Sequence, residues 1–205
     1  MPDSKLKLGV LVSGNGTNLQ AILEACKKGG IGAEVAVVIS NDSKAFALKR
    51  AEKFKIPTAV VPDTRDAEAE ILKILRNYKV DLVCLAGFMR LLSSSFLKVF
   101  SHRIINIHPA LLPSFPGLNA QKKAFDYGVK IAGATVHFVD EGCDTGAIIL
   151  QEAVAVEDDD TFETLREKIL KVEHKIYPKA IALIATERLK IIGRRVLGRT
   201  MDHGP

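Results

Sequence analysis

Two polar side chains stand two positions apart at the end of an apolar segment, IINIHP, at residues 104–109. In an extended strand such residues share a face, so Asn106 and His108 are expected to point the same way. An amide and an imidazole together can stabilise a developing oxyanion, and histidine can also move a proton near neutral pH. Pro109 cannot donate a ladder hydrogen bond and is expected to end the strand. The alternative is a structural pair bonded to the backbone.

An acidic loop, VDEGCDTG at residues 139–146, follows a strand-like run that contains His137. A hairpin turn explains some Asp and Gly residues, but three acids in five positions exceed what a turn needs. If Asp144 folds back against His108, its carboxylate would favour the charged imidazolium and orient the ring. Cys143 has no identifiable activating partner, and a structural role is at least as well supported for His137. No Cys/His spacing suggests a metal site.

A glycine-rich loop, SGNGTN at residues 13–18, comes directly after the first apolar run and opens a helical pattern. Glycine lets the backbone approach a ligand, and helix N–H groups attract an anion, so we expect a phosphate site. The loop is not a Walker A motif, and Leu19 replaces the third glycine of the dinucleotide fingerprint. Asp42, after the second strand, keeps dinucleotide binding open. A tight turn capped by Thr17 or Asn18 is the structural alternative.

The elements that carry these residues alternate between apolar runs and amphipathic stretches. Strands are predicted over residues 7–12, 34–40, 58–61, 81–86, 103–107, 132–139 and 147–156. Helices are predicted over residues 18–28, 44–55, 66–79 and 120–127, and from 158–161 to about 185. Strands without polar alternation indicate a parallel sheet covered on both faces. Pro178 is expected to kink or break the last helix, and residues 193–205 are expected to form a frayed tail.

Composition limits the class of protein. A chain of 205 residues, 47% hydrophobic and 26% charged, predicts one globular domain. The longest apolar run, residues 82–89, is far short of the roughly 18 residues of a membrane span, and LGVLV is too short for a signal peptide. Three distant cysteines without a CxxC pair fit a reducing cytoplasm. The net charge of +5 weakly favours anionic ligands but is too diffuse to predict nucleic-acid binding.

With these segments in order, the chain resembles the folate-dependent phosphoribosylglycinamide formyltransferases of purine (IMP) synthesis. The matching segments are VSGNGTNLQAI, LAGFMRLL, INIHPALLPSFPGLNA, GATVHFVDEGCDTGAIILQ and VEHKIYP. The resemblance implies a single-domain, Rossmann-like α/β formyltransferase fold, with a mostly parallel sheet and helices on both faces. It also implies a formyltransferase domain over residues 1–189, divided into a phosphate-binding half (about 1–100) and a folate and catalytic half (about 101–189), before a tail at 190–205.

The resemblance further implies that the amine of glycinamide ribonucleotide takes a formyl group from 10-formyltetrahydrofolate. The folate is a co-substrate, so no bound cofactor or metal is expected. Asn106, His108 and Asp144 match the catalytic residues of the family. Gly16, Thr17 and Asn18 match its substrate phosphate loop, and Glu173 matches another substrate-binding acid. The positions that match folate contacts are Arg65, Met89, Arg90, Leu91, Leu92, Asn106, Asp140, Glu141, Gly142, Cys143 and Asp144. Leu170 departs from the polar residue common in the family, so no role is assigned to it.

Three alternatives remain. A formyltetrahydrofolate hydrolase would share the site, but it is expected to carry an extra N-terminal domain, with no room for one before Leu8. A methionyl-tRNA formyltransferase is expected to carry a further C-terminal domain. A non-catalytic, nucleotide-phosphate-binding Rossmann module would leave Asn106, His108 and Asp144 without a purpose. We expect a cytoplasmic enzyme without nucleic-acid or membrane partners. A homodimer is one expected assembly.

Overall fold

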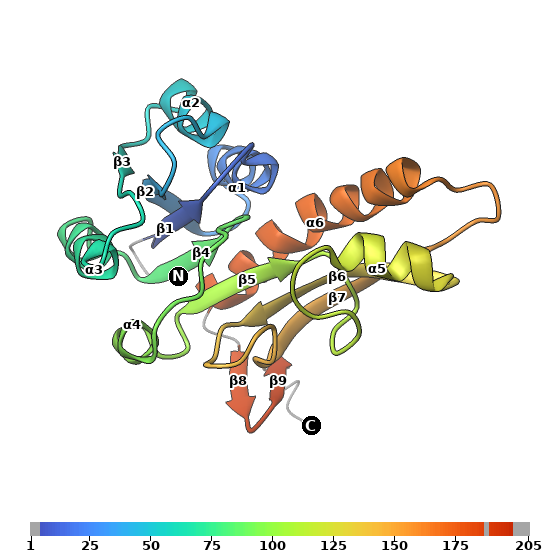
Figure 1. Ribbon diagram of the computed structural model, residues 1–205. Helices are drawn as coiled ribbons and strands as arrows, with labels where there is room; N and C mark the ends of the chain where they lie inside the picture. The colour runs from blue at the N-terminus through green and yellow to red at the C-terminus, as the bar shows by residue number, and fades with distance from the viewer. Residues whose placement is uncertain (1–4, 187–188, 199–205) are drawn as a thin grey trace.

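The computed structural model describes residues 5–186 and 189–198, which form a central sheet with helices on both faces (Figure 1). The nine strands of these residues lie in the order β3-β2-β1-β4-β5-β6-β7-β9-β8. Their bounds are β1 Leu6–Val12, β2 Ala33–Ser40, β3 Thr58–Val60, β4 Leu82–Leu85, β5 Ile104–His108, β6 Ile131–Phe138, β7 Ile148–Ala155, β8 Leu189–Ile192 and β9 Arg195–Gly198. Strands β1 to β5 are parallel, whereas β6 is antiparallel to both β5 and β7. The predicted α/β fold with a mostly parallel sheet is confirmed.

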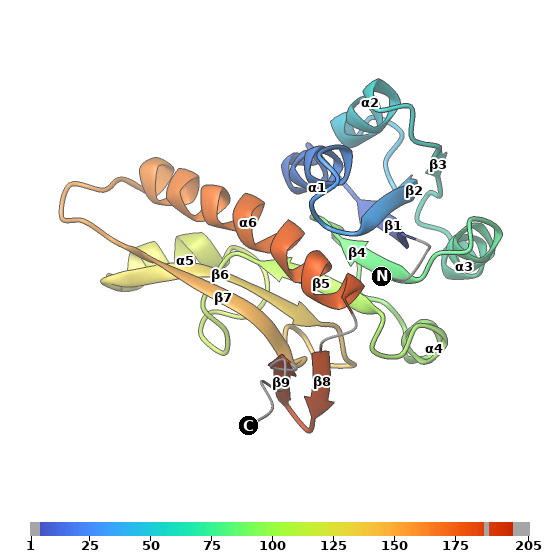
Figure 2. The same cartoon turned by 180° about the vertical axis from the view of Figure 1, so that it is seen from behind.

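Six helices in the described residues cover this sheet. They are α1 Thr17–Lys27, α2 Phe46–Lys53, α3 Ala67–Asn77, α4 Ser94–Val99, α5 Ala120–Tyr127 and α6 Phe162–Ala185. Helices α1 and α6 contribute Leu19 and Ile176 to one apolar core, and Figure 2 shows both helices in front of the sheet. Helices α3 and α4 contribute Ile71 and Phe96 to a second core. The sheet is therefore covered on both faces, as predicted.

Strand β1 shows why the parallel strands lack polar alternation. Leu8 and Val10 belong to the core that α1 and α6 cover, whereas Leu11 belongs to the core that α3 covers. Because helices cover both faces, both faces of the strand need apolar side chains. Gly9 lies against α3, where an added Cβ would overlap the side chain of Leu75. The sequence LKLGVLV thus suits a strand buried between two helical layers.

Two helical features differ from the sequence-based expectation. Helix α4 was not predicted, because it has only six residues and depends on Ser93, whose side chain accepts a hydrogen bond from the Phe96 N–H. Helix α6 runs continuously over 24 residues, so of the predicted kink or break at Pro178, the break is wrong and the kink stays a prediction. Proline removes one helical hydrogen bond. Here the buried side chains on both sides of Pro178, including Tyr177 and Ile181, hold the helix against the sheet.

The C-terminal region also differs from the expectation. The predicted frayed tail is wrong for the part that β9 occupies, because β8 and β9 form an antiparallel hairpin. Ile191 and Val196 pack against the larger core, and β9 pairs with β7 at Ile148 and Arg195. Alternation of half-buried and exposed residues in β8 is typical of an edge hairpin with one packed face. Residues 199–205 of the predicted tail lie outside the described residues, and the domain division at residue 189 stays a prediction.

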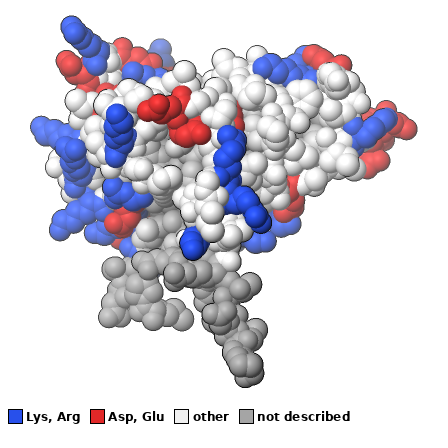
Figure 3. All heavy atoms as spheres, turned by 90° about the horizontal axis from the view of Figure 1, so that it is seen from below, with Lys and Arg blue, Asp and Glu red and all other residues white. Residues whose placement is uncertain are grey.

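The surface carries both signs of charge. Figure 3 shows Lys and Arg side chains interspersed with Asp and Glu across the face seen from below. Such mixing is typical of a solvated surface rather than a nucleic-acid platform. Among the described residues, no helix has the length and apolar character needed to cross a membrane.

Candidate active site

The two polar residues of β5 meet the acidic loop at the carboxyl end of the strand. Asp144, in the loop between β6 and β7, places its Oδ2 atom 3.2 Å from His108 Nδ1. Its other carboxylate oxygen, Oδ1, accepts a hydrogen bond of 3.5 Å from the Asn106 amide. The predicted approach of Asp144 to His108 is confirmed. One carboxylate therefore joins two side chains that could both face a reacting carbonyl.

Local structure holds these three residues in place. Ile105 and Ile107 belong to the core covered by α6, which directs Asn106 and His108 to the opposite face of β5. Asp144 has a φ of 56°, a left-handed conformation uncommon outside glycine. The Gly117 N–H donates to Asp144 Oδ2 over 2.8 Å and supports that conformation. The Asp144 carboxylate is thus positioned by the loop that follows β5 as well as by the β6–β7 loop to which Asp144 belongs.

His137 belongs to the same cluster, which sequence patterns did not establish. It lies opposite Asn106 in the β5–β6 register. Its Nε2 atom lies 3.4 Å from the Asn106 amide nitrogen and 3.6 Å from Asp144 Oδ1. Its Nδ1 atom donates to the Phe138 carbonyl over 2.8 Å. The register of β5 and β6 brings His137 to Asn106, and the local sequence does not reveal that register. His137 therefore contacts both Asn106 and Asp144 and helps to hold their side chains in place.

The charges of the cluster differ from the expectation in one respect. Burial lowers the pKa of His108 below its ordinary value, although the Phe115 carbonyl and the Asp144 carboxylate act in the opposite direction. The hydrogen bond with His137, followed by the Gly117 N–H and the charge of His108, holds the pKa of Asp144 far below its usual range. Asp144 favours imidazolium as predicted, but burial outweighs it. The Asp144 carboxylate therefore acts on His108 in the predicted direction, but burial has the larger effect on the pKa of the ring.

Both ring nitrogens of His108 nevertheless face hydrogen-bond acceptors. Its Nε2 atom lies 2.9 Å from the Phe115 carbonyl, and its Nδ1 atom faces Asp144. A neutral imidazole carries one N–H, whereas imidazolium carries two. The surroundings can thus satisfy a proton that arrives on the ring, while burial favours its release. This arrangement suits a residue that gains and loses a proton in each catalytic cycle.

The glycine-rich loop lies at the end of β1 and forms the N-terminus of α1. Gly16 is the N-cap residue with a φ of 72°, and an added Cβ there would overlap Ala47. No side chain caps this helix, so the predicted capping by Thr17 or Asn18 is wrong. The first N–H groups of a helix have no intrahelical partner. They are available to an anion, as the phosphate-site prediction requires.

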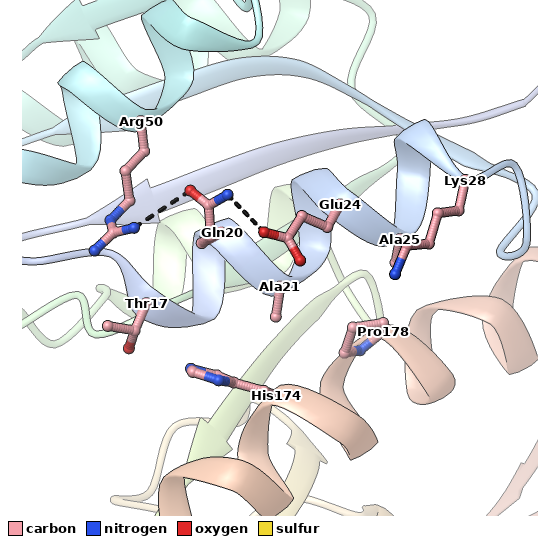
Figure 4. A pocket seen from close by; sticks show the side chains of 9 residues that line it. All are labelled: Thr17, Gln20, Ala21, Glu24, Ala25, Lys28, Arg50, His174 and Pro178. Carbon is pink, nitrogen blue, oxygen red and sulfur yellow. Dashed lines mark hydrogen bonds between the residues drawn. The ribbon is translucent and has the colours of Figure 1, made fainter.

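Arg50 of α2 fixes this loop and was not identified from the sequence. Its Nε and Nη2 atoms donate to the carbonyl and side-chain oxygens of Asn15, at 2.8 and 2.9 Å. Its Nη1 atom donates to Gln20 Oε1 at 3.3 Å, the contact drawn in Figure 4. The guanidinium also lies 4.9 Å from the centre of the Phe46 ring. Arg50 therefore joins both sides of the loop to one rigid helix.

Glu173 joins the phosphate loop to α6. Its Oε2 atom accepts a 2.6 Å hydrogen bond from Asn18 Nδ2. Glu173 is buried, with only 6% of its surface exposed. Burial raises the pKa of Glu173 to about 7, and the Asn18 hydrogen bond opposes that rise. Asn18 Oδ1 is buried without a hydrogen-bond partner among the described residues. A polar group of a ligand could satisfy that oxygen.

A cavity of about 420 Å³ lies beside the loop, between α1, α2 and α6 (Figure 4). Its lining residues are Thr17, Gln20, Ala21, Glu24, Ala25, Lys28, Arg50, His174 and Pro178. Thr17 and His174 stand closest to the loop end of this space in Figure 4. The cavity is lined by Thr17 and His174, the sequence neighbours of Asn18 and Glu173.

The segment after β4 supplies an apolar surface between the loop and the catalytic cluster. Met89 is 65% exposed and Leu91 is 83% exposed. Leu92 packs against the core covered by α3, and Arg90 forms a 2.9 Å ion pair with Asp63. The Met89 N–H donates to Ser13 Oγ over 3.0 Å. The exposed apolar side chains fit the predicted folate cleft.

The other predicted folate positions occupy less defined surroundings. Arg65 is exposed in the turn before α3, and Glu141 is exposed in the acidic loop. Asp140 accepts hydrogen bonds within its own loop, from the Gly142 N–H and the Thr145 hydroxyl. Partial burial and Asp144 raise the pKa of the Cys143 thiol, which disfavours a reactive thiolate. Their folate roles stay predictions.

These groups share one edge of the sheet. Strands β1, β4 and β5 are neighbours, and their carboxyl ends carry the phosphate loop, the Met89 segment and the catalytic cluster respectively. Ligands of open α/β sheets bind at this edge. No group of three metal-binding side chains occurs in the described part of the chain. The arrangement is that of an enzyme that joins a phosphorylated substrate to a second, partly apolar one.

Comparisons with known proteins agree with this class of site. The model of the formyl transferase family matches residues 6–181, so the chain belongs to this family. The phosphoribosylglycinamide formyltransferase of Bacillus subtilis is 44% identical over 180 residues, which cover 85% of this chain and 92% of that relative. The chain also matches the trifunctional purine biosynthetic protein adenosine-3 of Gallus gallus at 44% identity, covering 92% of this chain but 19% of that protein. The chain thus spans about a fifth of the length of that relative.

Solved structures give the same result. Glycinamide ribonucleotide transformylase 1 from Symbiobacterium toebii is similar with a TM-score of 0.92 and 52% identity, covering 95% of this chain and 94% of that one. A formyltetrahydrofolate deformylase from Pseudomonas syringae reaches a TM-score of 0.90 at 28% identity, covering 96% of this chain and 66% of that one. The formyltransferase fold is confirmed, and similarity in sequence is greater to the transformylase than to the deformylase.

Proposed function

We propose that this protein transfers the formyl group of 10-formyltetrahydrofolate to the amine of N1-(5-phospho-D-ribosyl)glycinamide in de novo purine (IMP) synthesis. The products are the N-formyl nucleotide and tetrahydrofolate. The observation that carries this proposal is the placement of Asn106, His108 and Asp144 on the same sheet edge as an uncapped helix N-terminus. The folate is consumed as a co-substrate, so the reaction requires no resident cofactor or metal.

The substrate phosphate binds at Gly16, Thr17 and Asn18, where the first N–H groups of α1 are free to donate. Asn18 Oδ1 and Glu173 lie at the seam beside that loop and bind polar groups of the same nucleotide. The folate lies against Met89 and the following three residues, with the acidic loop on its other side. This pose directs the nucleotide amine and the formyl carbon towards the end of β5.

The amine attacks the formyl carbon, which becomes a tetrahedral centre with a negatively charged oxygen. The Asn106 amide donates to that oxygen, and the His108 Nε2–H does so when it exchanges the Phe115 carbonyl for the oxyanion. Such donors act most strongly where charge develops in a site shielded from water. The His137 and Asp144 contacts fix the Asn106 amide before substrate arrives. The oxyanion therefore meets a positioned amide, which exchanges one of these long contacts for the new hydrogen bond.

Proton transfer balances the reaction. The attacking nitrogen loses one proton, the bond between the formyl carbon and the folate nitrogen breaks, and that folate nitrogen gains one proton. His108 carries the proton between the two nitrogens, directly or through water. Its lowered pKa leaves the ring able to accept, and Asp144 and the Phe115 carbonyl stabilise the imidazolium that forms. Asp144 itself stays ionised because its pKa is far below its usual range.

We further propose that the protein acts in the cytoplasm without nucleic-acid or membrane partners. A homodimer stays a prediction. The mixed-charge surface in Figure 3 supports the absence of a nucleic-acid partner on that face.

An absorbance assay with 10-formyl-5,8-dideazafolate tests the proposal, with and without glycinamide ribonucleotide. We expect loss of the formyl group only when the nucleotide is present. Equal turnover in water would indicate a formylfolate hydrolase instead. Binding of nucleotide phosphates without any turnover would indicate a Rossmann binding module. Asn106→Ala, measured beside the wild type, shows whether turnover depends on the proposed site.

A further inference from the structure

We infer that Arg194, in the turn of the C-terminal β8–β9 hairpin, is a positioning residue for the loop that carries Asp144. Its Nη2 atom donates to the Thr145 carbonyl over 2.7 Å. Thr145 directly follows Asp144, so the hydrogen bond acts on the Thr145–Gly146 peptide, one peptide unit beyond the bond that joins Asp144 to Thr145. The inference rests on the proposed function, because it assigns Arg194 a role in the same reaction.

The hairpin is anchored so that it can hold this loop. Strand β9 pairs with β7 at Arg195 and Ile148, and β7 begins two residues after the loop ends at Gly146. The β8–β9 hairpin lies directly below the β6–β7 loop in Figure 1. Ile191 and Val196 pack against the larger core and fix the hairpin to the body of the protein. Arg194 therefore extends from a supported turn.

The acidic loop needs contacts from outside itself. Asp144 adopts a φ of 56°, which costs energy for a non-glycine residue and persists only where the surroundings require it. On the active-site side, the Gly117 N–H holds the Asp144 carboxylate. On the other side, Arg194 holds the Thr145 carbonyl. Asp144 is thus fixed between two hydrogen bonds that come from different parts of the chain.

A cavity behind the loop makes the Arg194 contact more important. About 290 Å³ separates the loop, α4 and the hairpin, and Arg194 lines this space together with Asp140, Glu141 and Thr145. The loop consequently lacks close packing over part of its rear surface. A hydrogen bond that crosses from the hairpin limits the movement that such a cavity would permit.

The hairpin lies beyond residues 6–181, the part that the formyl transferase family model matches. Its role is therefore an addition to the proposed catalytic residues. Arg194 does not contact His108 or Asn106 by any hydrogen bond of the described residues. It acts through Thr145 and Asp144. A small displacement of a catalytic group can lower the rate by about 100-fold, which sets the scale of the expected effect.

Arg194→Ala tests this role, with Arg195→Ala as the matched control. Arg195 is exposed in the same hairpin, and its replacement by Ala removes the same charge. Within residues 5–186 and 189–198, its side chain forms no hydrogen bond. We expect kcat to fall by roughly 10- to 100-fold in Arg194→Ala, with KM for the nucleotide changed by less than about threefold. Arg195→Ala is expected to keep the wild-type kcat. Arg194→Gln retains an N–H donor and is expected to recover part of the loss.

The pH profile separates positioning from general destabilisation. Asp144 raises the pKa of His108, so a displaced Asp144 lets that pKa fall further. The acid limb of kcat/KM is expected to move to lower pH in Arg194→Ala but not in Arg195→Ala. An unchanged kcat and pH profile in folded Arg194→Ala overturns the inference, as does an equal loss in both variants. If Arg194→Ala does not fold, Arg194→Gln decides by the same criteria.

Amide hydrogen exchange keeps this inference distinct from the proposed function. Residues 139–147 are expected to exchange faster in Arg194→Ala than in the wild type and in Arg195→Ala. If the wild type transfers no formyl group, the proposed function fails, and unchanged exchange of this segment separately rejects the Arg194 contact. Faster exchange with wild-type kcat rejects the catalytic role of the contact, although the contact itself exists.

Discussion

The phosphate-binding end of the site and its catalytic end are built in different ways. Gly16, Thr17 and Asn18 are consecutive and present backbone N–H groups at one helix N-terminus. The catalytic cluster joins side chains that are 38 residues apart, Asn106 and Asp144, and depends on His137 from a third segment. A contiguous loop can be recognised from a motif, whereas the cluster depends on strand register. Substitutions in the phosphate loop should therefore have independent effects on binding. Substitutions in the catalytic cluster should each remove most of the activity that the cluster supplies.

The two ends also treat buried carboxylates in opposite ways. Asp144 accepts hydrogen bonds from several donors, which holds its pKa far below the usual range. Glu173 has one donor, Asn18, and burial raises its pKa to about 7. Burial outweighs the single donor at Glu173, whereas hydrogen bonds outweigh burial at Asp144, so the balance of the two effects sets the charge of each carboxylate. The catalytic end keeps a permanent charge, while the phosphate end holds a group that titrates near neutrality.

The largest expected effect is the loss of the catalytic unit. Asn106→Ala removes an oxyanion donor, which in enzymes costs about 100- to 1,000-fold in kcat, or roughly 2.7–4 kcal/mol. His108→Ala is expected to cost at least as much, because it also removes the proton carrier. Because the two residues act together, the double variant should lose far less than the product of the single losses. Steady-state kinetics of the three variants measures this.

Binding provides the control for that prediction. Nucleotide and folate affinities of the folded variants should stay within about an order of magnitude of the wild type, because the phosphate loop and the Met89 segment are untouched. Calorimetry can measure both. Near wild-type kcat in Asn106→Ala and His108→Ala would falsify the proposed mechanism. Unfolding of both variants would instead favour a structural role for the pair.

The second effect concerns the titrating carboxylate at the phosphate end. Glu173 has a folded-state pKa of about 7 against an ordinary value of 4.5, so the folded protein binds a proton more tightly than the unfolded chain. The free energy of unfolding should therefore decrease as pH rises from about 4.5 to about 7, by at most about 3 kcal/mol from this group. Glu173→Gln cannot ionise and should lose that decrease. Urea unfolding at pH 5 and pH 8 measures it.

The quantity to compare is the change in the free energy of unfolding with pH in the wild type and in Glu173→Gln. We expect Glu173→Gln to gain stability relative to the wild type between pH 5 and pH 8. Glu152→Gln is a suitable control, since that carboxylate pairs with Lys175 on the surface of α6. An equal pH dependence in the wild type and Glu173→Gln would show that Glu173 does not titrate in this range.

Much of the fold could be predicted because the signals are local. Uniformly apolar strands such as β1 indicated a parallel sheet, and the glycine-rich loop indicated the start of α1. Asn106 and His108 were recognised from their spacing within one strand. Helix α4 is too short to show a periodic pattern, and the β8–β9 hairpin joins the sheet through a pairing with β7 that is distant in sequence.

The remaining site residues depend on distant contacts. Arg50 reaches Asn15 across 35 residues, and Arg194 reaches Thr145 across 49. Neither contact produces a pattern in the local sequence. The charge of His108 also required the structure, because burial and the Asp144 carboxylate act in opposite directions. The sequence showed that His108 and Asp144 could interact, and the structure showed that burial has the larger effect on the pKa of His108.

The third effect is a charge placed at the phosphate loop. Thr17→Asp puts a carboxylate beside the incoming phosphate, and like charges a few ångströms apart repel by several tenths to a few kcal/mol, depending on solvent. We expect nucleotide affinity to fall by about tenfold or more, with folate affinity changed little. Thr17→Val keeps the size without the charge and serves as the control. Unchanged nucleotide binding in folded Thr17→Asp, measured by calorimetry, would place the phosphate elsewhere.

The smallest expected effect tests whether the phosphate loop depends on α2. Arg50→Ala removes the hydrogen bonds to Asn15 and Gln20 but leaves the N–H groups of α1 in place. Hydrogen bonds from charged groups contribute about 1.5–3 kcal/mol when buried, and less here because the contacts to Asn15 are exposed. We therefore expect KM for the nucleotide to rise about three- to tenfold while kcat at saturation stays unchanged. Lys49→Ala, exposed on the same helix, is the matched control. A lower kcat at saturating nucleotide would mean that the two ends are coupled, contrary to their separate construction.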